Sequence, residues 1–463
     1  MGKDAAGLVA SLADNNTNNT NITTTMQNHV QDERGSLRAG TVGTVKTRQI
    51  IAAVIGNALE WYDFVVYGFL TVIISRLFFP ADSDYASLLA AMATFGVGFF
   101  MRPVGGILIG MYADRRGRKA ALQLIILLMT ISMAMIAFAP THAAIGAAAP
   151  VLIVLARLLQ GVATGGEFAS ATAFLVESAP PSRRGFFGSL QMFGQGIAAL
   201  GGATAGMLIT QGLTPEQVDS WGWRIPFMVG LLIGPVGLWM RRHLEETEAF
   251  MEAAREPAGE VGLRVLWREH RRALLSSFGL VLSSTIMFYV VLVYMPTYAK
   301  TQLGIPLGDA FTAQVAGLLC LIVMTPLFGL LSDRIGRRPV MMLASVAYLI
   351  LPYPLLAWLL AEPGLARLAT MQMIVCSAIG IGFGAVSTAL AEQFPVRMRS
   401  TGLALSYNIA VMLFGGFAQL IVTWLIKVTG SPLAPAYYVM FGAVVGLAAS
   451  WFLAEPSEHE FNA

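Results

Sequence analysis

The sequence predicts an all-α membrane protein with twelve transmembrane helices in two six-helix halves. Three observations support this fold class. Hydrophobic residues make up 56% of the 463 residues, charged residues make up only 12%, and the mean hydropathy is +0.66, whereas soluble domains carry about 25% charged residues. Twelve apolar runs approach or exceed the roughly 20 residues that a bilayer-spanning helix needs. A short basic motif occurs twice, nearly half the chain apart, which is typical of a protein built from two repeats.

The polar segments divide the chain into parts. Residues 1–47 are rich in Asn, Thr, Asp and Gly, so they can bury little apolar surface, and we expect a disordered cytoplasmic tail. Residues 48–243 are predicted to form an N-terminal six-helix bundle and residues 273–454 a C-terminal one. Between them, the charged segment 244–272 is predicted to be a cytoplasmic linker with short amphipathic helices. Residues 455–463 are predicted to be a short cytoplasmic tail.

The twelve runs follow one another with short polar connections. They cover about 50–79, 85–112, 119–140, 147–176, 184–211, 222–243, 273–299, 308–332, 338–361, 366–391, 400–427 and 434–454. The basic motif lies between the second and third runs and again between the eighth and ninth. The two copies therefore occupy the same place in each half, which is what an internal repeat predicts.

The repeated motif also orients the chain. It reads GMYADRRGRK at residues 110–119 and GLLSDRIGRR at residues 329–338, and Asp114 and Asp333 are 219 residues apart. Such basic loops between apolar helices are typical of the cytoplasmic side. With both termini in the cytoplasm, 23 Lys and Arg residues lie on that side and five outside. We therefore predict that both termini are cytoplasmic.

Ionisable residues inside the predicted spans are functional candidates, because a charge within a bilayer is costly. The first half carries all of them: Glu60, Asp63, Arg102, Arg157 and Glu167. The second half has only neutral polar groups away from its helix ends. These include Tyr294, Tyr298, Gln314, Tyr407, Asn408 and Gln419. We therefore expect proton chemistry in the first half and hydrogen bonding to a substrate in the second.

The first span places polar residues on one stripe. Asn57, Glu60, Asp63 (or Phe64) and Tyr67 recur every three or four residues, so we expect them to face a central cavity. A carboxyl group that moves between a dry environment and the neighbourhood of an arginine can take up and release a proton.

No histidine lies in an apolar run, so the candidates for proton coupling are the acids of the first half. They are Asp63, Glu60 and Glu167. The alternative is that these acids form fixed ion pairs with Arg102 and Arg157 that hold helices together.

The two arginines in the membrane are candidate substrate ligands. A guanidinium binds a carboxylate through two parallel hydrogen bonds, and only Arg102 and Arg157 lie deep enough to do so. For Arg102, a structural or gating role is the alternative. Further candidates for substrate binding are the polar groups Asn57, Tyr67, Tyr294, Tyr298 and Asn408.

Several motifs resemble those of a known family. Besides the repeated loop, they are GNALEWYDF at 56–64, FMRPVGG at 100–106, RLLQG at 157–161 with GGE at 165–167, GWRIPF at 222–227 and ETEAF at 246–250. Together they resemble the major facilitator superfamily and, within it, the metabolite:proton symporter family. That family includes carriers for citrate, tricarballylate, α-ketoglutarate, shikimate and proline/betaine. Residues 76–88 and 293–298 are most similar to the citrate and tricarballylate carriers.

The basic loops are predicted to form a cytoplasmic gate. Asp114 and Asp333 can lie at helix N-termini across the interface between the halves, where the helix dipole favours an anion. The other predicted gate residues are Arg115, Arg118 and Arg334, which can bridge to Glu177 and Glu392. The resemblance implies that these contacts latch the gate while the carrier opens outward. The alternative, anchoring of the cytoplasmic side by the arginines, does not account for the aspartates.

The resulting functional prediction is a proton-coupled symporter that imports a small organic acid, a citrate- or tricarballylate-like di- or tricarboxylate, across the inner membrane by alternating access. The alternative cargo is a zwitterionic or neutral metabolite of the proline/betaine or shikimate type. A non-transporting sensor would need a sizeable soluble output domain. An enzyme is not expected, because the sequence has no nucleophile–base set, metal-ligand cluster or nucleotide loop. We expect no cofactor, metal or nucleic acid, and the resemblance implies a monomer in the lipid bilayer.

Overall fold

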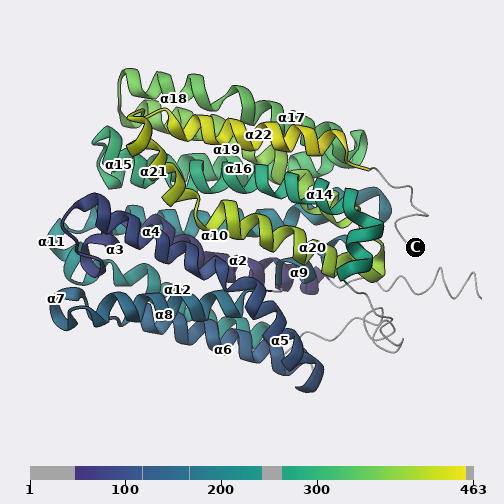
Figure 1. The fold of residues 1–463 in the computed structure, drawn as a ribbon, viewed down its shortest axis with the longest axis horizontal. Coiled ribbons are helices and arrows are strands. Elements are labelled where there is room, and N and C mark those ends of the chain that lie inside the picture. Colours follow the sequence, from purple (N-terminus) through teal and green to yellow (C-terminus); the bar gives the residue numbers. More distant parts are fainter. Residues whose placement is uncertain (1–46, 117, 166, 242–262, 455–463) are drawn as a thin grey trace, which may run out of the picture. The chain divides into compact units, whose positions relative to one another are not determined.

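The computed structural model describes residues 47–116, 118–165, 167–241 and 263–454 (Figure 1). Among these residues the regular structure is helical throughout, without a strand. The predicted tail 1–47, apart from its last residue, lies outside the described residues. So do most of the predicted linker and the C-terminal tail 455–463.

The first half contains six spans, several of which are broken into two helices. Span one is α2 (Thr47–Phe69) with α3 (Thr71–Phe78), span two is α4 (Asp84–Phe100) with α5 (Arg102–Arg116), span three is α6 (Arg118–Ala137), span four is α8 (Ala148–Ala163) with α9 (Glu167–Glu177), span five is α10 (Arg184–Gly212) and span six is α12 (Arg224–Arg241). The short helices α7 (His142–Ile145) and α11 (Pro215–Gln217) lie in the connections.

The second half repeats this pattern. Span seven is α14 (Leu263–Phe288), the π-helical segment η3 (Tyr289–Val293) and α15 (Met295–Leu303), span eight is α16 (Leu307–Ile335), span nine is α17 (Arg337–Ile350) with α18 (Pro352–Ala361), span ten is α19 (Leu365–Ala391), span eleven is α20 (Val396–Ala410), the π-helical segment η4 (Val411–Gly416) and α21 (Ala418–Thr429), and span twelve is α22 (Ala434–Trp451). Among the residues that the structure describes, eight helical segments are long and apolar enough to cross a membrane, and α2 with α3, bent by 64°, adds a ninth. The twelve-helix prediction is confirmed.

The C-terminal end of the predicted linker is helical. Helix α14 begins at Leu263, and a kink at His270 separates its first residues from span seven. Leu266 is fully buried, and Trp267 beside it is 58% exposed. This segment has no Gly or Pro to stop a helix. Its backbone departs from helical geometry only at His270.

The two halves contact each other at both ends of the bundle. Helix α10 of the first half lies beside α16 of the second (Figure 1). At the end that carries the repeated loops, which we call the basic end, Thr388 Oγ1 donates a hydrogen bond to the Arg184 carbonyl (3.0 Å). At the opposite, far end, Gln211 Nε2 donates to Thr312 Oγ1 (2.7 Å).

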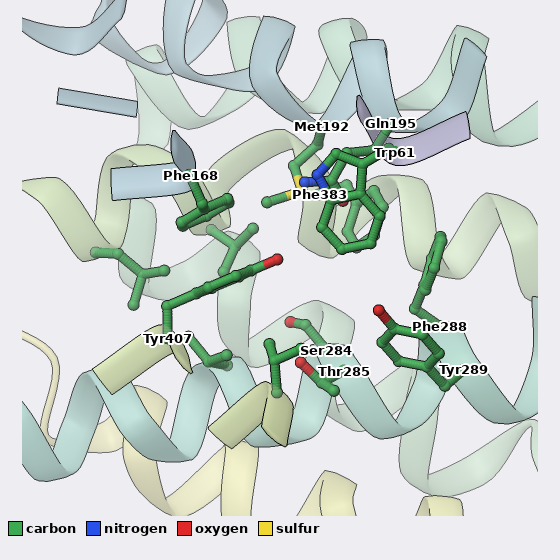
Figure 2. A pocket seen from close by; sticks show the side chains of 14 residues that line it. Trp61, Phe168, Met192, Gln195, Ser284, Thr285, Phe288, Tyr289, Phe383 and Tyr407 are labelled. Carbon is green, nitrogen blue, oxygen red and sulfur yellow. The ribbon is translucent and has the colours of Figure 1, made fainter. Parts of the chain in front are cut away.

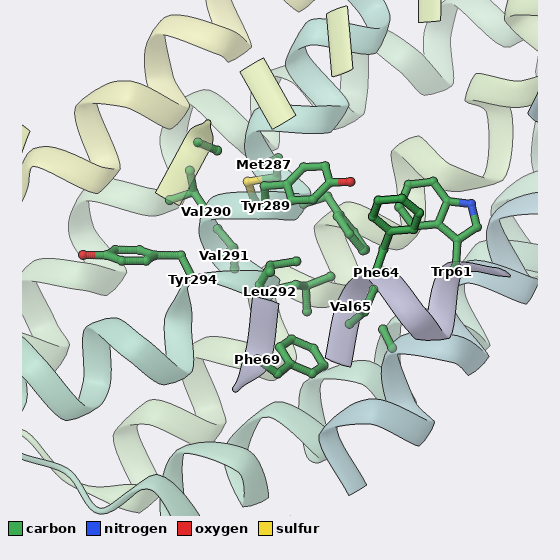
Figure 3. Packing of buried hydrophobic residues seen from close by; sticks show 14 of the residues in the cluster. Trp61, Phe64, Val65, Phe69, Met287, Tyr289, Val290, Val291, Leu292 and Tyr294 are labelled. Carbon is green, nitrogen blue, oxygen red and sulfur yellow. The ribbon is translucent and has the colours of Figure 1, made fainter. Parts of the chain in front are cut away.

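Between these two ends, the halves share an apolar core built on α2 and η3. The Trp61 ring packs edge-on against Phe288 with 6.2 Å between centroids, and Phe69 packs against Phe311 at 6.1 Å. Figure 3 shows the side chains of α2 and of η3 packed in this core. Close packing also depends on Gly96, where a Cβ would lie 2.4 Å from the Phe417 ring.

Candidate functional site

A pair of buried arginines lies beside one phenylalanine in the first half. The Arg102 guanidinium lies 4.5 Å from the Phe64 ring centroid, and that of Arg157 lies 4.8 Å from the same centroid. Arg102 also packs over Phe99 (4.4 Å) and Trp61 (5.5 Å). Aromatic faces attract cations in desolvated sites, so these rings hold the charges without consuming the planar edge that a carboxylate would use.

Arg157 is further fixed by polar neighbours. It is fully buried and hydrogen-bonds through Nη1 to Gln160 Oε1 on the next turn of α8. Its Nη2 donates a long hydrogen bond to the Phe95 carbonyl (3.5 Å). Arg102 is 4% exposed, and its Nε has no hydrogen-bond partner among the described residues. Arg157 Nε also has no partner among the described residues, so each of the two arginines keeps a donor for an incoming ligand.

Asp63 lies in the interior of the first half. Its side chain is 4% exposed, and Oδ1 has no hydrogen-bond partner among the residues that the structure describes. A Cβ at Gly230 of α12 would lie 2.8 Å from this oxygen. Arg157 interacts with Asp63 electrostatically, but no ion pair of Asp63 occurs among the described side chains. The fixed-pair alternative is therefore not what this conformation shows for Asp63.

A small cavity lies between the halves (Figure 2). Its volume is about 30 Å³, which is room for one or two water molecules. The lining comes from both halves: Trp61, Phe168, Met192, Gln195, Val281, Ser284, Thr285, Phe288, Tyr289, Phe383, Val386, Leu390, Tyr407 and Val411. Sites for small molecules usually have several hundred Å³. The halves must therefore move apart before this cavity can hold a metabolite.

The polar groups of the cavity are mostly without partners. Gln195 Nε2, Ser284 Oγ and the Tyr289 hydroxyl are buried and have no hydrogen-bond partner among the described residues. Figure 2 shows these side chains around the cavity. The Tyr407 hydroxyl interacts with Gln195 and with Arg102, which lies behind the cavity wall. Unpaired buried donors are costly, so a ligand with acceptor oxygens would satisfy them.

The predicted polar stripe of the first span lies elsewhere. Trp61 is the α2 residue that lines the cavity, and Asp63, two residues on, points about 200° away around the helix. Asn57 exchanges hydrogen bonds with Gln191 (both 2.9 Å), and the Tyr67 hydroxyl donates to the Ala91 carbonyl (3.2 Å). These residues of the stripe pack within the first half rather than against the cavity.

Other predicted residues lie at different depths. Glu60 is 8% exposed and interacts with Tyr407 across the halves. Asn408 Nδ2 donates to the Gly165 carbonyl (2.9 Å), which also joins the halves. Tyr294 pairs with Thr423 (3.1 Å), and Tyr298 donates to the Pro432 carbonyl (2.8 Å). Neither tyrosine lines this cavity. The side chain of Glu167 lies outside the described residues.

The predicted gate contains one aspartate at a helix N-terminus. Asp333 Oδ1 accepts a hydrogen bond from the Gly185 N–H (2.6 Å), and Oδ2 accepts one from the Phe186 N–H (2.9 Å). These are the first N–H groups of α10, in the other half. A carboxylate is stabilised there by free N–H donors and by the helix dipole. The side chains of Asp114, Arg115 and Arg118 lie outside the described residues.

Two arginines outside the predicted set bridge to the predicted acids. Arg399 Nη1 lies 2.7 Å from Glu177 Oε1 and joins the halves. Arg337 lies 2.9 Å from Asp333 and 3.3 Å from Glu392. Arg334 is exposed and has no ion pair among the described residues. Arg334 lies in the last turn of α16, whereas Arg337 begins α17 after the cap residue Gly336.

Sequence analysis also missed most of the cavity lining. Tyr407 is an intramembrane polar group in the sequence but is not among the predicted site residues, and neither are Gln195, Tyr289 and Ser284. The available signal was that Gln195 and Tyr289 are polar or amphipathic groups inside apolar runs. Trp61 and Phe168 give no such signal, because an aromatic residue in a membrane span is usually a packing residue.

Two repeated six-helix halves, an interface closed at both ends and a small central cavity define a multi-pass membrane protein of the carrier type. The family model described as Major Facilitator Superfamily matches residues 20–405, and the chain belongs to that superfamily.

Characterised relatives cover most of the chain. The citrate-proton symporter of Salmonella typhi is 37% identical over 417 residues, which cover 90% of this chain and 94% of the relative. The proline/betaine transporter of Salmonella typhimurium is 36% identical over 411 residues, which cover 86% of this chain and 82% of the relative. A solved D-xylose-proton symporter superposes with a TM-score of 0.71 at 18% identity, covering 90% of this chain and 98% of that one. This last likeness supports the fold alone.

Proposed function

We propose that this protein is a proton-coupled symporter that imports a citrate- or tricarballylate-like carboxylate by alternating access. The observation that carries the proposal is the set of buried, unpaired donors around the cavity, with the free Nε of Arg102 behind them. Several donors and a guanidinium match an anion with many acceptor oxygens. The identity of 37% with a citrate-proton symporter supports the same cargo.

The proposed transport cycle uses the two ends of the bundle as gates. In this conformation Arg399 and Glu177 join the halves at the basic end, and Gln211 and Thr312 join them at the far end. Opening one end at a time would expose the same cavity alternately to each side. Glu60, Asp63 and Glu167 are the proposed proton carriers, and Asp63 is the first choice because no described side chain pairs with it.

The same proposal covers the location and the oligomeric state of the protein. We propose a monomer in the inner membrane, with the basic end and both termini in the cytoplasm. In this orientation the gate formed by Asp333, Arg337, Glu392, Glu177 and Arg399 is the cytoplasmic one. Asp114, Arg115 and Arg118 are proposed to belong to it by the repeat.

A zwitterion is the second candidate cargo, and the aromatic lining favours it. Six of the cavity residues are aromatic: Trp61, Phe168, Phe288, Tyr289, Phe383 and Tyr407. The Phe168 and Tyr407 rings stack across the halves at 3.6 Å. Aromatic rings around a cavity suit a quaternary ammonium group, and Arg102 would then bind the single carboxylate. A proline/betaine transporter at 36% identity agrees with this cargo.

A competition experiment tests the choice. Uptake of radiolabelled citrate is measured in cells that express the chain, with unlabelled tricarballylate, α-ketoglutarate, shikimate and glycine betaine as competitors. The proposal predicts uptake of citrate that tricarballylate inhibits and betaine does not. Uptake of labelled betaine, with no uptake of citrate, would reject the carboxylate cargo in favour of the zwitterion.

A further inference from the structure

The carboxyl group of Asp63 lies in a separate compartment from the cavity between the halves. Asp63 does not line that cavity, whereas Trp61 on the same helix does. Helix α12 approaches Asp63 closely at Gly230, where a Cβ would lie 2.8 Å from Oδ1 and 2.4 Å from Met133 Cε of α6. Tyr62, next to Asp63, donates a hydrogen bond to the Pro226 carbonyl of α12 (3.0 Å). This bond fixes α2 against α12 one turn from Gly230.

Few charged or titratable groups face this carboxyl. Among the described residues they are Arg157 on α8 and the Tyr62 phenol on α2, with Glu60 one turn earlier on the same helix. From α6 and α12 the facing residues are Met133 and Gly230, which carry no charge. The carboxyl therefore has an apolar wall on one side and a guanidinium on another. Small changes in this wall alter the burial of the Asp63 carboxyl group, and burial controls its proton affinity.

We propose that Gly230 is a positioning residue for the proton site, because its missing side chain leaves the space that the Asp63 carboxyl occupies between α2, α6, α8 and α12. The inference rests on the proposed proton-carrying role of Asp63. Gly230 is helical with ordinary backbone angles, so the helix itself does not need glycine there. Alanine would even be the better helix former. A methyl group at this position would meet the carboxylate at a distance that van der Waals contact does not allow.

The chain offers a matched control four residues further along the same helix. A Cβ at Gly234 would lie 2.3 Å from Thr130 Oγ1 of α6 and would not approach Asp63. Gly230→Ala and Gly234→Ala therefore add the same methyl group to the same face of α12 and press on the same neighbouring helix. They differ in whether the methyl group touches the carboxyl.

The test is a pH titration of the purified full-length protein by infrared difference spectroscopy, without substrate. The carbonyl band of protonated Asp63 is assigned by its loss in Asp63→Asn. Gly230→Ala is expected to move the titration midpoint of this band, and Gly234→Ala is expected to leave it at the wild-type value. If Gly230→Ala does not fold, Met133→Ala, which opens the same wall, is expected to move the midpoint instead.

Equal midpoints in wild type, Gly230→Ala and Gly234→Ala would overturn the inference. The proposed function is tested separately by uptake. If Asp63→Asn still concentrates citrate, the proton-carrying role of Asp63 fails, while a shifted midpoint in Gly230→Ala would still show that Gly230 positions the carboxyl.

Discussion

Arg399 and Glu177 form an ion pair, 2.7 Å apart, that connects the two halves of the protein. Arg399 is fully buried, whereas the Glu177 side chain is 41% exposed. The guanidinium is also held within its own half, because Nε donates to the Ala391 carbonyl (2.9 Å). The second half therefore presents a fixed cation, and in this conformation the first half supplies the anion. This is the arrangement expected of a latch.

Glu177→Gln should weaken the closed state of the basic end. Since Glu177 is partly exposed, we expect a loss of about 1 kcal/mol, or roughly fivefold in the ratio of closed to open forms. The measurement is maleimide labelling of Ser387→Cys, a buried position on α19, in a background without Cys320 and Cys376. Labelling should become faster by a similar factor.

The control for this prediction is Glu362→Gln. It removes the exposed Arg367–Glu362 pair, which lies within the second half near the far end. Labelling of Ser387→Cys should stay at the parental rate in this variant. Equal labelling rates in Glu177→Gln and Glu362→Gln would contradict the latch.

Glu392 predicts a pH dependence of stability. Burial raises the pKa of its carboxyl above the usual 4.5, and Arg337 opposes the shift. A carboxyl whose pKa is raised on folding contributes stability below pH 4.5 and loses it as the pH rises through the folded value. Glu392→Gln should therefore melt with less dependence on pH above 4.5 than wild type. Thermal unfolding across this range is the measurement, and an unchanged slope would refute the prediction.

Arg102→Lys should weaken carboxylate binding although it keeps the charge. An ammonium cannot present the planar face that packs between Phe64 and Phe99, and it lacks the Nε–H. We expect the apparent affinity for citrate to fall about tenfold to a hundredfold, as for the loss of a charged hydrogen bond. Arg224→Lys is the control, because Arg224 stacks on Trp223 away from the cavity. Equal affinities in the two variants would remove Arg102 from the site.

Gln419→Leu should stabilise the protein. Gln419 is fully buried, and neither its Nε2 nor its Oε1 has a hydrogen-bond partner among the described residues. Removing such an amide should raise stability by about 1–3 kcal/mol. The contrast is Gln372→Leu, because Gln372 donates to the Val291 carbonyl (3.1 Å) and to Gln314 (2.9 Å). Melting temperatures should move in opposite directions, and a lower value for Gln419→Leu would disprove the prediction.

The fold could be predicted because it depends on chain-wide patterns. Long apolar runs have one solution in a bilayer, and a motif repeated at an offset of 219 residues fixes the two halves. Asp333 could be placed near a helix N-terminus because dipoles act locally. The cationic partner of Asp333 could not be predicted, although Arg337 corresponds to the predicted gate residue Arg118 at the repeat offset of 219 residues. Which of several neighbouring arginines faces an acid depends on where α16 ends and α17 begins.

The site was less predictable for a geometric reason. Successive residues on a helix are about 100° apart. Asp63 of the polar stripe and the cavity-facing Trp61 are therefore only two positions apart in the sequence, although they point in different directions. Choosing between them requires knowing where α12 lies, and that depends on contacts such as Gly230 with Asp63. The rings around Arg102 come from α2 and α4, and no local pattern signals that they surround a cation.

The central claim is that a proton gradient drives the uptake of a carboxylate through Asp63. The most direct measurement is accumulation of radiolabelled citrate in proteoliposomes with an imposed pH gradient, for wild type and Asp63→Asn. We predict that wild type concentrates citrate, that an uncoupler abolishes this accumulation, and that Asp63→Asn supports only exchange. Concentrative uptake by Asp63→Asn, or wild-type accumulation that an uncoupler leaves intact, would contradict the account.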